Sequence, residues 1–275
     1  MRTAVFITLI SAIFQISICC NAIAETRLSH IHSQQLHLTY DIFVGGFHSG
    51  SIDLSVKLEE RSYELFAITK SAGFIDYLIR FRSYAQTRGK KDKENLSPLS
   101  HHVNNLRTGD IRFVRMGYIN PAQKFRGPEF AVIHPLPEVD DREIVPNDMR
   151  RNTIDPLSAA LRAAYSAKMR EGRLSCDDSI PVFDGRRRYD LVFKDAGAEV
   201  IDGPYYNGTT RKCLASIRRI IGFSRNPFLP RSKDLEGGEI WFADLVPGWP
   251  PVPVRFKTDV GLGNAFVHLT GHELR

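Results

Sequence analysis

The clearest β-hairpin signal in the chain is IPVFDGRRRYDLVF, residues 180–193. The pair Asp184-Gly185 separates two apolar runs, and Asp-Gly is typical of the two-residue turn that joins antiparallel strands. With such a turn, Val182 pairs with Arg187 across the ladder. The segment therefore predicts a β-hairpin centred on the Asp-Gly pair.

The two faces of this hairpin differ in character, because side chains along a strand alternate between faces. Most apolar side chains fall on one face, together with Arg187, which either lines a cavity or lies at the rim. The rim is favoured, since hairpin tips are usually solvated. We take four residues as candidate ligand-facing groups: Arg187, Tyr189 and Leu191 on this face, and Tyr40 in an N-terminal strand.

The hairpin is flanked by Cys176 and Cys213, and the two other cysteines, Cys19 and Cys20, lie in an apolar N-terminal segment. Two remaining cysteines allow one pairing, and an exported chain meets an oxidising compartment. Closing this loop should stabilise the fold by about 4 kcal/mol in the chain-entropy model. A catalytic or metal-binding pair is the rival interpretation, but there is no Cys-x-x-Cys spacing and no nearby histidine. We therefore predict a structural disulfide.

The N-terminus has the features of a secretory signal. A positively charged start precedes the apolar run Val5–Ile18, and Ala22-Ile23-Ala24 is a small-x-small cleavage site. Residues 1–24 are thus expected to be removed after Ala24. A lipoprotein signal ending at Cys19 is the alternative, although isoleucine precedes that cysteine where a small residue is needed. No later run approaches about 18 apolar residues, so we expect no transmembrane helix.

Alternating apolar and polar residues predict many strands. The clearest case is Ile52–Leu58, which forms a hairpin with the preceding strand at Leu36–Val44 and has one buried and one solvated face. Pro253 suggests an edge strand or the first residue of a strand. In total the pattern indicates roughly ten to thirteen strands. Further strands are expected at Tyr63–Lys70, Tyr84–Arg88, Leu99–Leu106, Ile111–Ile119, Phe130–His134, Thr209–Ile221, Glu239–Leu245, Val252–Phe256 and Ala265–Leu269, with a charged turn at Gly89–Lys93.

One or two helices interrupt the strands. Asp155 is a favourable N-cap and Pro156 suits the first helical position, so a helix is expected from there to near Gly172. Within Ala72–Arg82, apolar residues recur at helical spacing. This second segment predicts a short helix or bulged crossover that covers one mouth of the sheet.

These elements indicate a mainly β fold. Short local connections make neighbouring strands antiparallel, and a sheet this large must curl or close to protect its edges. We expect a large curved antiparallel sheet that forms a partly closed barrel or β-spiral, with one or two helices packed against it and the helix that begins at Asp155 on its concave side. Residues 25–275 are expected to form a single domain.

No catalytic or metal-binding pattern emerges. His48-Ser49 lies in a hairpin turn and not in the strand–turn–helix context of a nucleophile elbow. His101 and His102 are neighbours in a strand and point to opposite faces, so they cannot share a metal. There is no phosphate loop, dinucleotide motif or zinc spacing. We therefore expect no enzymatic activity, no cofactor and no metal.

Composition and charge narrow the class of partner. The 275 residues are 43% hydrophobic and 25% charged, which is typical of a globular protein. The net charge of +6 is mild and its basic residues are dispersed. A nucleic-acid-binding protein normally has a denser basic stripe and a known motif, so nucleic acid is not an expected partner.

The sequence also resembles a known family. The matching segments are YDIFVGG at 40–46, TIDPLS at 153–158, residues 181–191 around Asp184-Gly185, and PPVPV at 250–254. Through them the chain resembles domain-of-unknown-function family 3108, a group of uncharacterised exported bacterial proteins. The resemblance covers nearly all of the mature chain and implies a curved β-rich periplasmic protein of Gram-negative bacteria. It implies no activity and no catalytic residues.

Together these observations favour a non-enzymatic periplasmic protein that binds an apolar or amphipathic envelope molecule in a concave β surface. The ligand would be a lipid, a lipoprotein or a peptide. The alternative is a structural envelope-integrity protein that acts through contacts with other envelope proteins or with peptidoglycan.

Overall fold

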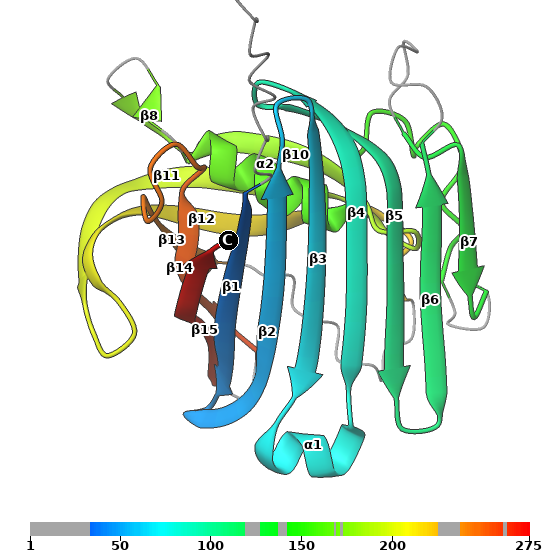
Figure 1. Cartoon of the computed structure of the whole chain (residues 1–275). Coiled ribbons are helices and arrows are strands. Elements are labelled where there is room, and N and C mark those ends of the chain that lie inside the picture. Colours follow the sequence, from blue (N-terminus) through cyan, green and yellow to red (C-terminus); the bar gives the residue numbers. More distant parts are fainter. Residues whose placement is uncertain are drawn as a thin grey trace, which may run out of the picture. The chain divides into compact units, whose positions relative to one another are not determined.

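Thirteen antiparallel strands form one large sheet in the described part of the chain (Figure 1). The computed structural model describes residues 34–118, 127–136, 142–167, 169–170, 173–224, 237–260 and 263–275, all within the unit Ser33–Arg275. The expected signal sequence lies outside these residues. The strands of the sheet are β1 (Gln35–Val44), β2 (Phe47–Leu58), β3 (Ser62–Ser71), β4 (Arg82–Asp92), β5 (Asn95–Arg107), β6 (Asp110–Gly117), β7 (Phe130–His134), β10 (Asp178–Phe183), β11 (Arg188–Asp202), β12 (Asn207–Ile221), β13 (Gly238–Ala243), β14 (Val252–Asp259) and β15 (Asn264–Leu274).

The sheet consists of two meanders that meet in its middle. Its spatial order is β10-β11-β12-β13-β14-β15-β1-β2-β3-β4-β5-β6-β7, so the last strand pairs with the first. Gln35 and Arg275 exchange backbone hydrogen bonds of 2.8 and 2.9 Å at this junction. A separate pair, β8 (Met169–Arg170) and β9 (Arg173–Leu174), completes the described strands. The prediction of a mainly β, antiparallel architecture is confirmed.

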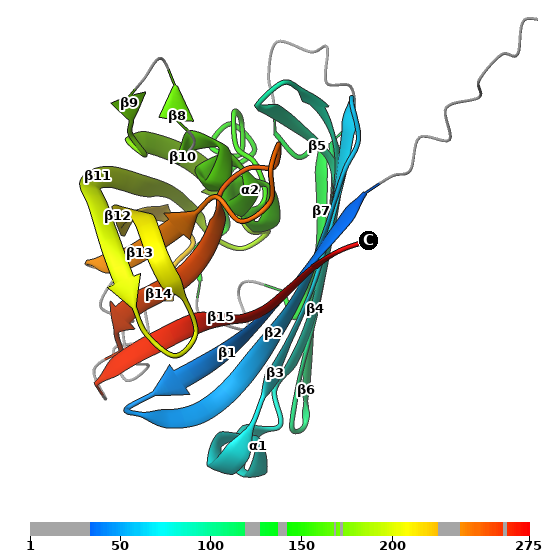
Figure 2. The same ribbon diagram turned by 60° about the vertical axis from the view of Figure 1, so that its left-hand side comes forward.

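The sheet curves strongly but does not close through hydrogen bonds, because β10 and β7 remain its outer strands (Figure 2). Side chains join the two ends instead. Phe183 at the end of β10 is fully buried in a cluster with Val114 and Met116 of β6. The Arg186 guanidinium donates a 2.7 Å hydrogen bond to the carbonyl of His134, the last residue of β7. The sheet is therefore curved and not closed, and side-chain contacts bring its two ends together.

Helix α2 (Pro156–Ser166) lies on the concave side and links both halves of the sheet, since it packs against β10 and also against β4 and β5 (Figure 2). Leu161 and Tyr165 on one side belong to the largest core cluster. Ala159 and Ala163 on the other side belong to a second cluster with β10 and β11. Small alanines let the helix approach that half of the sheet closely. The expected Asp155 cap and Pro156 start are present, but the helix ends at Ser166, before the expected end near Gly172.

The two-residue turn predicted for the central hairpin is wrong, because the strands pair two residues further along β11 than expected. Val182 pairs with Tyr189 rather than with Arg187, so the loop contains the four residues Asp184–Arg187. The Asp184 carboxylate accepts hydrogen bonds from the backbone N–H groups of Arg186 and Arg187, at 2.9 and 2.7 Å, which stabilises the longer loop. A shift of two residues preserves the face of every strand side chain, so the predicted apolar face persists without its arginine.

Two other local predictions are wrong. Pro253 is the second residue of the interior strand β14, so it is neither in an edge strand nor first in its strand. It faces Phe242 where the register shifts, and a bulge tolerates the missing N–H. The turn expected at Gly89–Lys93 is mostly strand, because β4 continues to Asp92. Gly89 is required there for another reason: a Cβ atom would lie 2.3 Å from the ring of Tyr63.

Helix α1 (Gly73–Ile79) confirms the short helix expected in Ala72–Arg82, but not its orientation. Phe74, Tyr77 and Leu78 were expected to cover a mouth of the sheet, yet all three are exposed. Polar contacts of Asp76 fix the helix to the neighbouring strands and leave its apolar side chains in solvent.

Candidate functional site

An apolar pocket of about 240 Å³ opens between α2 and the concave side of β11–β14. We call it the α2 pocket. Ser216 is the one lining residue with a polar side chain. The pocket is lined by Ala160 and Ala163 of α2, Leu191 and Phe193 of β11, Ala215, Ser216 and Ile217 of β12, Ile240 and Phe242 of β13, and Pro253 and Phe256 of β14.

The strand register explains why these side chains converge. Leu191 faces Ile217 and Phe193 faces Ala215 across the β11–β12 ladder. Side chains directly opposite in a ladder share a face, and Ile240 and Phe256 continue this apolar face onto β13 and β14. Ala160 and Ala163 are too short to fill the space above it. The pocket therefore results from apolar alternation on four strands opposite the alanine side of one helix.

Two guanidinium groups lie at the hairpin end of this face, one from strand β12 and one from the β10–β11 loop. Arg219 pairs with Tyr189, two residues along β11 from Leu191, or roughly 7 Å at the usual strand rise. The Arg219 guanidinium carbon is 4.1 Å from the ring centre of Phe223, and that of Arg187 is 5.8 Å from it. Arg187 also donates through Nε to Asp184 at 2.7 Å. The apolar face thus runs toward a cationic, hydrogen-bonding rim.

The four candidate ligand-facing residues have different environments. Leu191 lines the α2 pocket. Tyr189 is buried in the second core cluster, where its ring lies under the Arg187 guanidinium. Arg187 lies in the hairpin loop with 44% of its side chain exposed. Tyr40 belongs to the largest cluster, and burial raises the pKa of its hydroxyl. The structure thus groups three of the four and separates Tyr40.

The predicted cysteine pair lies beside this region. The sulfur atoms of Cys176 and Cys213 are 2.07 Å apart, which is the distance of a disulfide bond. Both residues are buried in the second core cluster, with Ala163 and Phe242 of the pocket lining. The link therefore holds the segment before β10 against β12.

A larger groove of about 1360 Å³ lies between α2, β10 and the β4–β5 turn, and its lining is largely polar. Arg162 of α2 makes a two-pronged ion pair with Asp178, at 3.0 and 2.9 Å. The lining also includes Lys93, Glu94 and Asp177. This groove does not match the apolar ligand that the sequence favours.

Sequence reasoning missed a buried polar network beneath the start of α2. Asp155 is fully buried, and its Oδ1 accepts hydrogen bonds from the N–H groups of Leu157 and Ser158 and from the Thr87 hydroxyl. Oδ2 accepts from the Ser158 hydroxyl at 2.6 Å. Because Ser158 donates to Asp155, the Tyr63 hydroxyl must donate to Ser158 across 2.7 Å. The network ties α2 to β3 and β4.

His101 completes this network as the neighbour of the buried carboxylate. Its Nδ1 lies 3.2 Å from Asp155 Oδ1 and 2.7 Å from the Thr87 hydroxyl. Burial raises the pKa of Asp155, but the charge and hydrogen bonds of His101 and the hydrogen bonds of Ser158 outweigh burial and hold that pKa below its usual value. No spacing in the sequence signalled this group, since its members come from three strands and a helix cap.

The network has the residue types of a hydrolase triad without its connectivity. Ser158 donates to the aspartate, whereas a triad serine donates to the histidine. His101, Asp155 and Ser158 are each at most 1% exposed. The arrangement is that of a helix anchor. At the other candidate, the Ser49 hydroxyl donates to the Phe47 carbonyl, while His48 contacts Asp41 at 3.3 Å.

In the described residues, no group of three His, Cys, Asp or Glu side chains is placed to hold a metal ion. Neither helix in the same ranges has the length and apolar character needed to cross a bilayer.

Comparisons with known proteins were made for the whole chain. The model of the family described as "Protein of unknown function (DUF3108)" matches residues 39–270. No curated protein is similar enough to match. Among solved structures, a β-barrel-like protein of the domain of unknown function DUF1849 from Brucella abortus aligns with 8% identity and a TM-score of 0.47, over 88% of this chain and 97% of that one.

Proposed function

This chain belongs to the DUF3108 family of proteins of unknown function, and we propose that it binds the apolar part of an amphipathic molecule in the α2 pocket. The observation that carries the proposal is the lining, in which Ser216 is the single polar side chain. Pockets lined mainly by apolar side chains, with a few polar groups at fixed positions, are typical of small-molecule sites.

The size of the pocket limits what enters it. At about 240 Å³ it lies below the roughly 300–1,000 Å³ of pockets that enclose a whole drug-sized ligand. It suits one acyl chain segment or one ring. Each buried methylene contributes about 0.8 kcal/mol, so about six of them contribute roughly 5 kcal/mol before the cost of ordering the ligand. The site is therefore suited to holding part of a lipid or lipopeptide.

The cationic rim determines the polar part of the ligand. Guanidinium groups bind carboxylates and phosphates through parallel N–H donors. Arg219 lies beyond Leu191 on the same face, and the guanidinium of Arg187, from the adjoining loop, lies over the same Phe223 ring, so an acyl chain in the pocket would direct its head group toward them. We therefore propose an amphipathic anion as the ligand. The expected secretory signal makes the periplasm the proposed place of binding.

The test uses a dansyl-labelled undecanoic acid and its fluorescence on titration with the full chain. Ala160 is exposed at the pocket and is the site of the blocking change, because a side chain added there does not enter the core. Ala160→Trp should weaken binding at least tenfold, whereas the matched variant Ala160→Ser should stay within about threefold of wild type, since it changes the volume little. Equal affinity for all three proteins, at unchanged melting temperature, would refute the proposal.

A further inference from the structure

Helix α1 presents an apolar face to solvent. Phe74 is 72% exposed, Tyr77 is 81% exposed and Leu78 is 55% exposed. Residues three and four apart share one face of a helix, so these side chains form a single stripe. Surface helices normally turn such a stripe toward the core. In α1 no residue is buried, and the stripe points outward.

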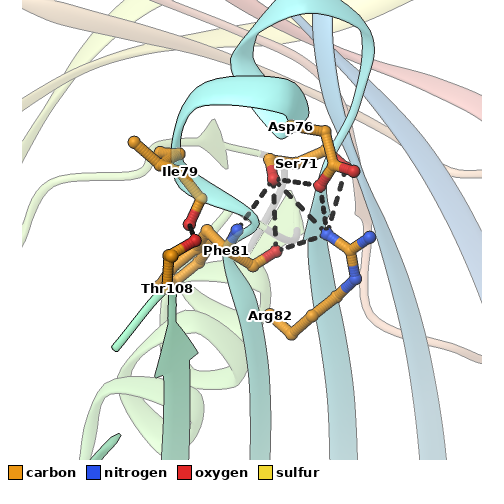
Figure 3. Close-up of polar contacts among 6 residues, drawn as sticks. All are labelled: Ser71, Asp76, Ile79, Phe81, Arg82 and Thr108. Carbon is orange, nitrogen blue, oxygen red and sulfur yellow. Dashed lines mark hydrogen bonds and ion pairs between the residues drawn. The ribbon is translucent and has the colours of Figure 1, made fainter. Parts of the chain in front are cut away.

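The orientation of α1 is fixed by polar contacts on its other side (Figure 3). The Asp76 carboxylate accepts hydrogen bonds of 2.6 Å from Arg82 and 2.7 Å from Ser71. The Thr108 N–H and hydroxyl both donate to the carbonyl of Ile79, each at 3.3 Å. Because strands β3, β4 and the β5–β6 turn all hold the helix, the outward stripe is a built feature of the fold.

Other exposed apolar side chains come from the same end of the sheet. The β1–β2 turn, α1 and the β5–β6 turn all lie at this end, with α1 between the two turns (Figure 1). Phe47 beside the first turn is 79% exposed, and Ile111 beside the last is 60% exposed. The Ala72 N–H donates to the Ser49 carbonyl at 2.9 Å and so ties α1 to β2. We call the exposed group Phe47, Phe74, Tyr77, Leu78 and Ile111 the apolar tip.

Two arginines next to the apolar tip leave an excess of positive charge there. Arg80 follows α1 directly and Arg107 precedes the β5–β6 turn, and both are exposed. Within the described ranges neither takes part in an ion pair shorter than 4 Å, whereas the nearby acids Asp76 and Asp110 are paired with arginines. A negatively charged partner is therefore favoured.

The chemistry and shape of the tip identify the partner. A stable protein interface needs about 20–30 residues a side, far more than these five side chains supply, so a second copy of the chain is a poor fit. Aromatic side chains and arginines on a protruding helix are typical of elements that lie in a membrane interface. Anionic lipids attract basic residues that come near the surface.

We propose that the apolar tip inserts into the surface of a bilayer that contains anionic lipids. Phe74, Tyr77 and Leu78 enter the acyl boundary, while Arg80 and Arg107 lie at the level of the head groups. This contact is independent of the α2 pocket, which opens on the concave side of other strands.

The test reads insertion at the tip itself, because the apolar run Val5–Ile18 of the full chain could also bring it to vesicles. The probe is the variant Tyr77→Trp, mixed with vesicles of brominated phosphatidylcholine that contain about 30% phosphatidylglycerol. The emission that the tryptophan introduced at position 77 adds to that of the wild-type chain should fall at least twofold when the vesicles are added. The matched control is Val200→Trp, at a 68% exposed position on β11, whose added emission should not change.

Two further comparisons make the result decisive. Arg80→Glu with Arg107→Glu, in the Tyr77→Trp chain, should reduce the quenching at least threefold at unchanged melting temperature. Brominated vesicles without phosphatidylglycerol should quench the Tyr77→Trp protein no more than vesicles with phosphatidylglycerol quench this charge-reversed variant. Absence of quenching at position 77, equal quenching at positions 77 and 200, or equal quenching by both lipid mixtures would each overturn the proposal. Ala160→Trp should leave the quenching unchanged, so failure of pocket binding and failure of insertion are distinguishable.

Discussion

Replacing Asp155 by alanine tests whether the buried network anchors α2. Its carboxylate is fully buried and caps the helix, with hydrogen bonds of 3.0 Å from the N–H groups of Leu157 and Ser158. It also accepts hydrogen bonds from the hydroxyls of Thr87 and Ser158 and faces His101. Alanine removes every one of these contacts at once without exposing the site to water.

The expected loss of stability is large. Loss of an aspartate N-cap costs about 1 kcal/mol. Each buried donor left without its acceptor costs roughly 1–3 kcal/mol, and Thr87, His101 and the Ser158 hydroxyl are all affected. The sum is roughly 4–10 kcal/mol, comparable with the total of about 5–15 kcal/mol for a typical domain. Asp155→Asn, which retains the volume and a capping oxygen, should cost about 1–3 kcal/mol.

The assay is urea unfolding followed by the fluorescence of the buried Trp241 and Trp249. The matched control is Asp178→Asn, which also contacts α2 but pairs with an Arg162 side chain that is 41% exposed. An exposed pair contributes at most about 1 kcal/mol. If Asp155→Ala lost no more stability than Asp178→Asn, at an unchanged denaturant slope, the network would not be an anchor.

Three other changes have defined outcomes. Because the pKa of Asp155 is lowered on folding, its ionised carboxylate stabilises the fold above the pKa of the unfolded chain, about 3.9, and this stabilisation is lost as the pH falls through the pKa of the folded protein. Between about pH 5 and pH 2, wild type should therefore lose more stability than Asp155→Asn, as measured by the urea midpoint at each pH. Cys176→Ser opens a link between residues 37 apart and should lower stability by about 4 kcal/mol; an unchanged melting temperature would indicate free thiols. Gly185→Ala places a Cβ atom 2.3 Å from Val114 at a φ of +91° and should lower stability by at least about 2 kcal/mol. The control Gly109→Ala has a similar φ of +75° but open space around it, and should lower stability by about 1 kcal/mol. Equal losses of stability in urea unfolding would show that the contact of Gly185 with β6 is unimportant.

Local patterns predicted the strands and the second helix well. The alternation in Ile52–Leu58 and the Asp155-Pro156 start are decided by neighbouring residues, and the structure contains β2 and α2 there. The hairpin register was not predictable from Asp184-Gly185 alone. Its loop length depends on how the Asp184 carboxylate bonds to Arg186 and Arg187 and on the packing of Gly185 against Val114. The approach of Gly185 to Val114 joins the loop to strand β6, far away in the sequence, and no local pattern reports it.

The candidate site was less predictable, because it depends on residues far apart in the chain. Leu191 could be assigned to an apolar face from alternation, but Ala160 and Phe256 meet it only through the path of the sheet. His101 carried no local signal of its contact with Asp155. The helical spacing in α1 was visible, yet its direction was set by Asp76.

The pairing of β1 with β15 has a consequence for biogenesis. During synthesis or export, β1 to β7 can form a meander early, but β1 keeps one unsatisfied backbone edge until β15 (Asn264–Leu274) emerges. Such an edge is a template for association with other chains. The last strand to appear thus seals the centre of the sheet, and a product truncated before it would consist of two unjoined halves prone to aggregation.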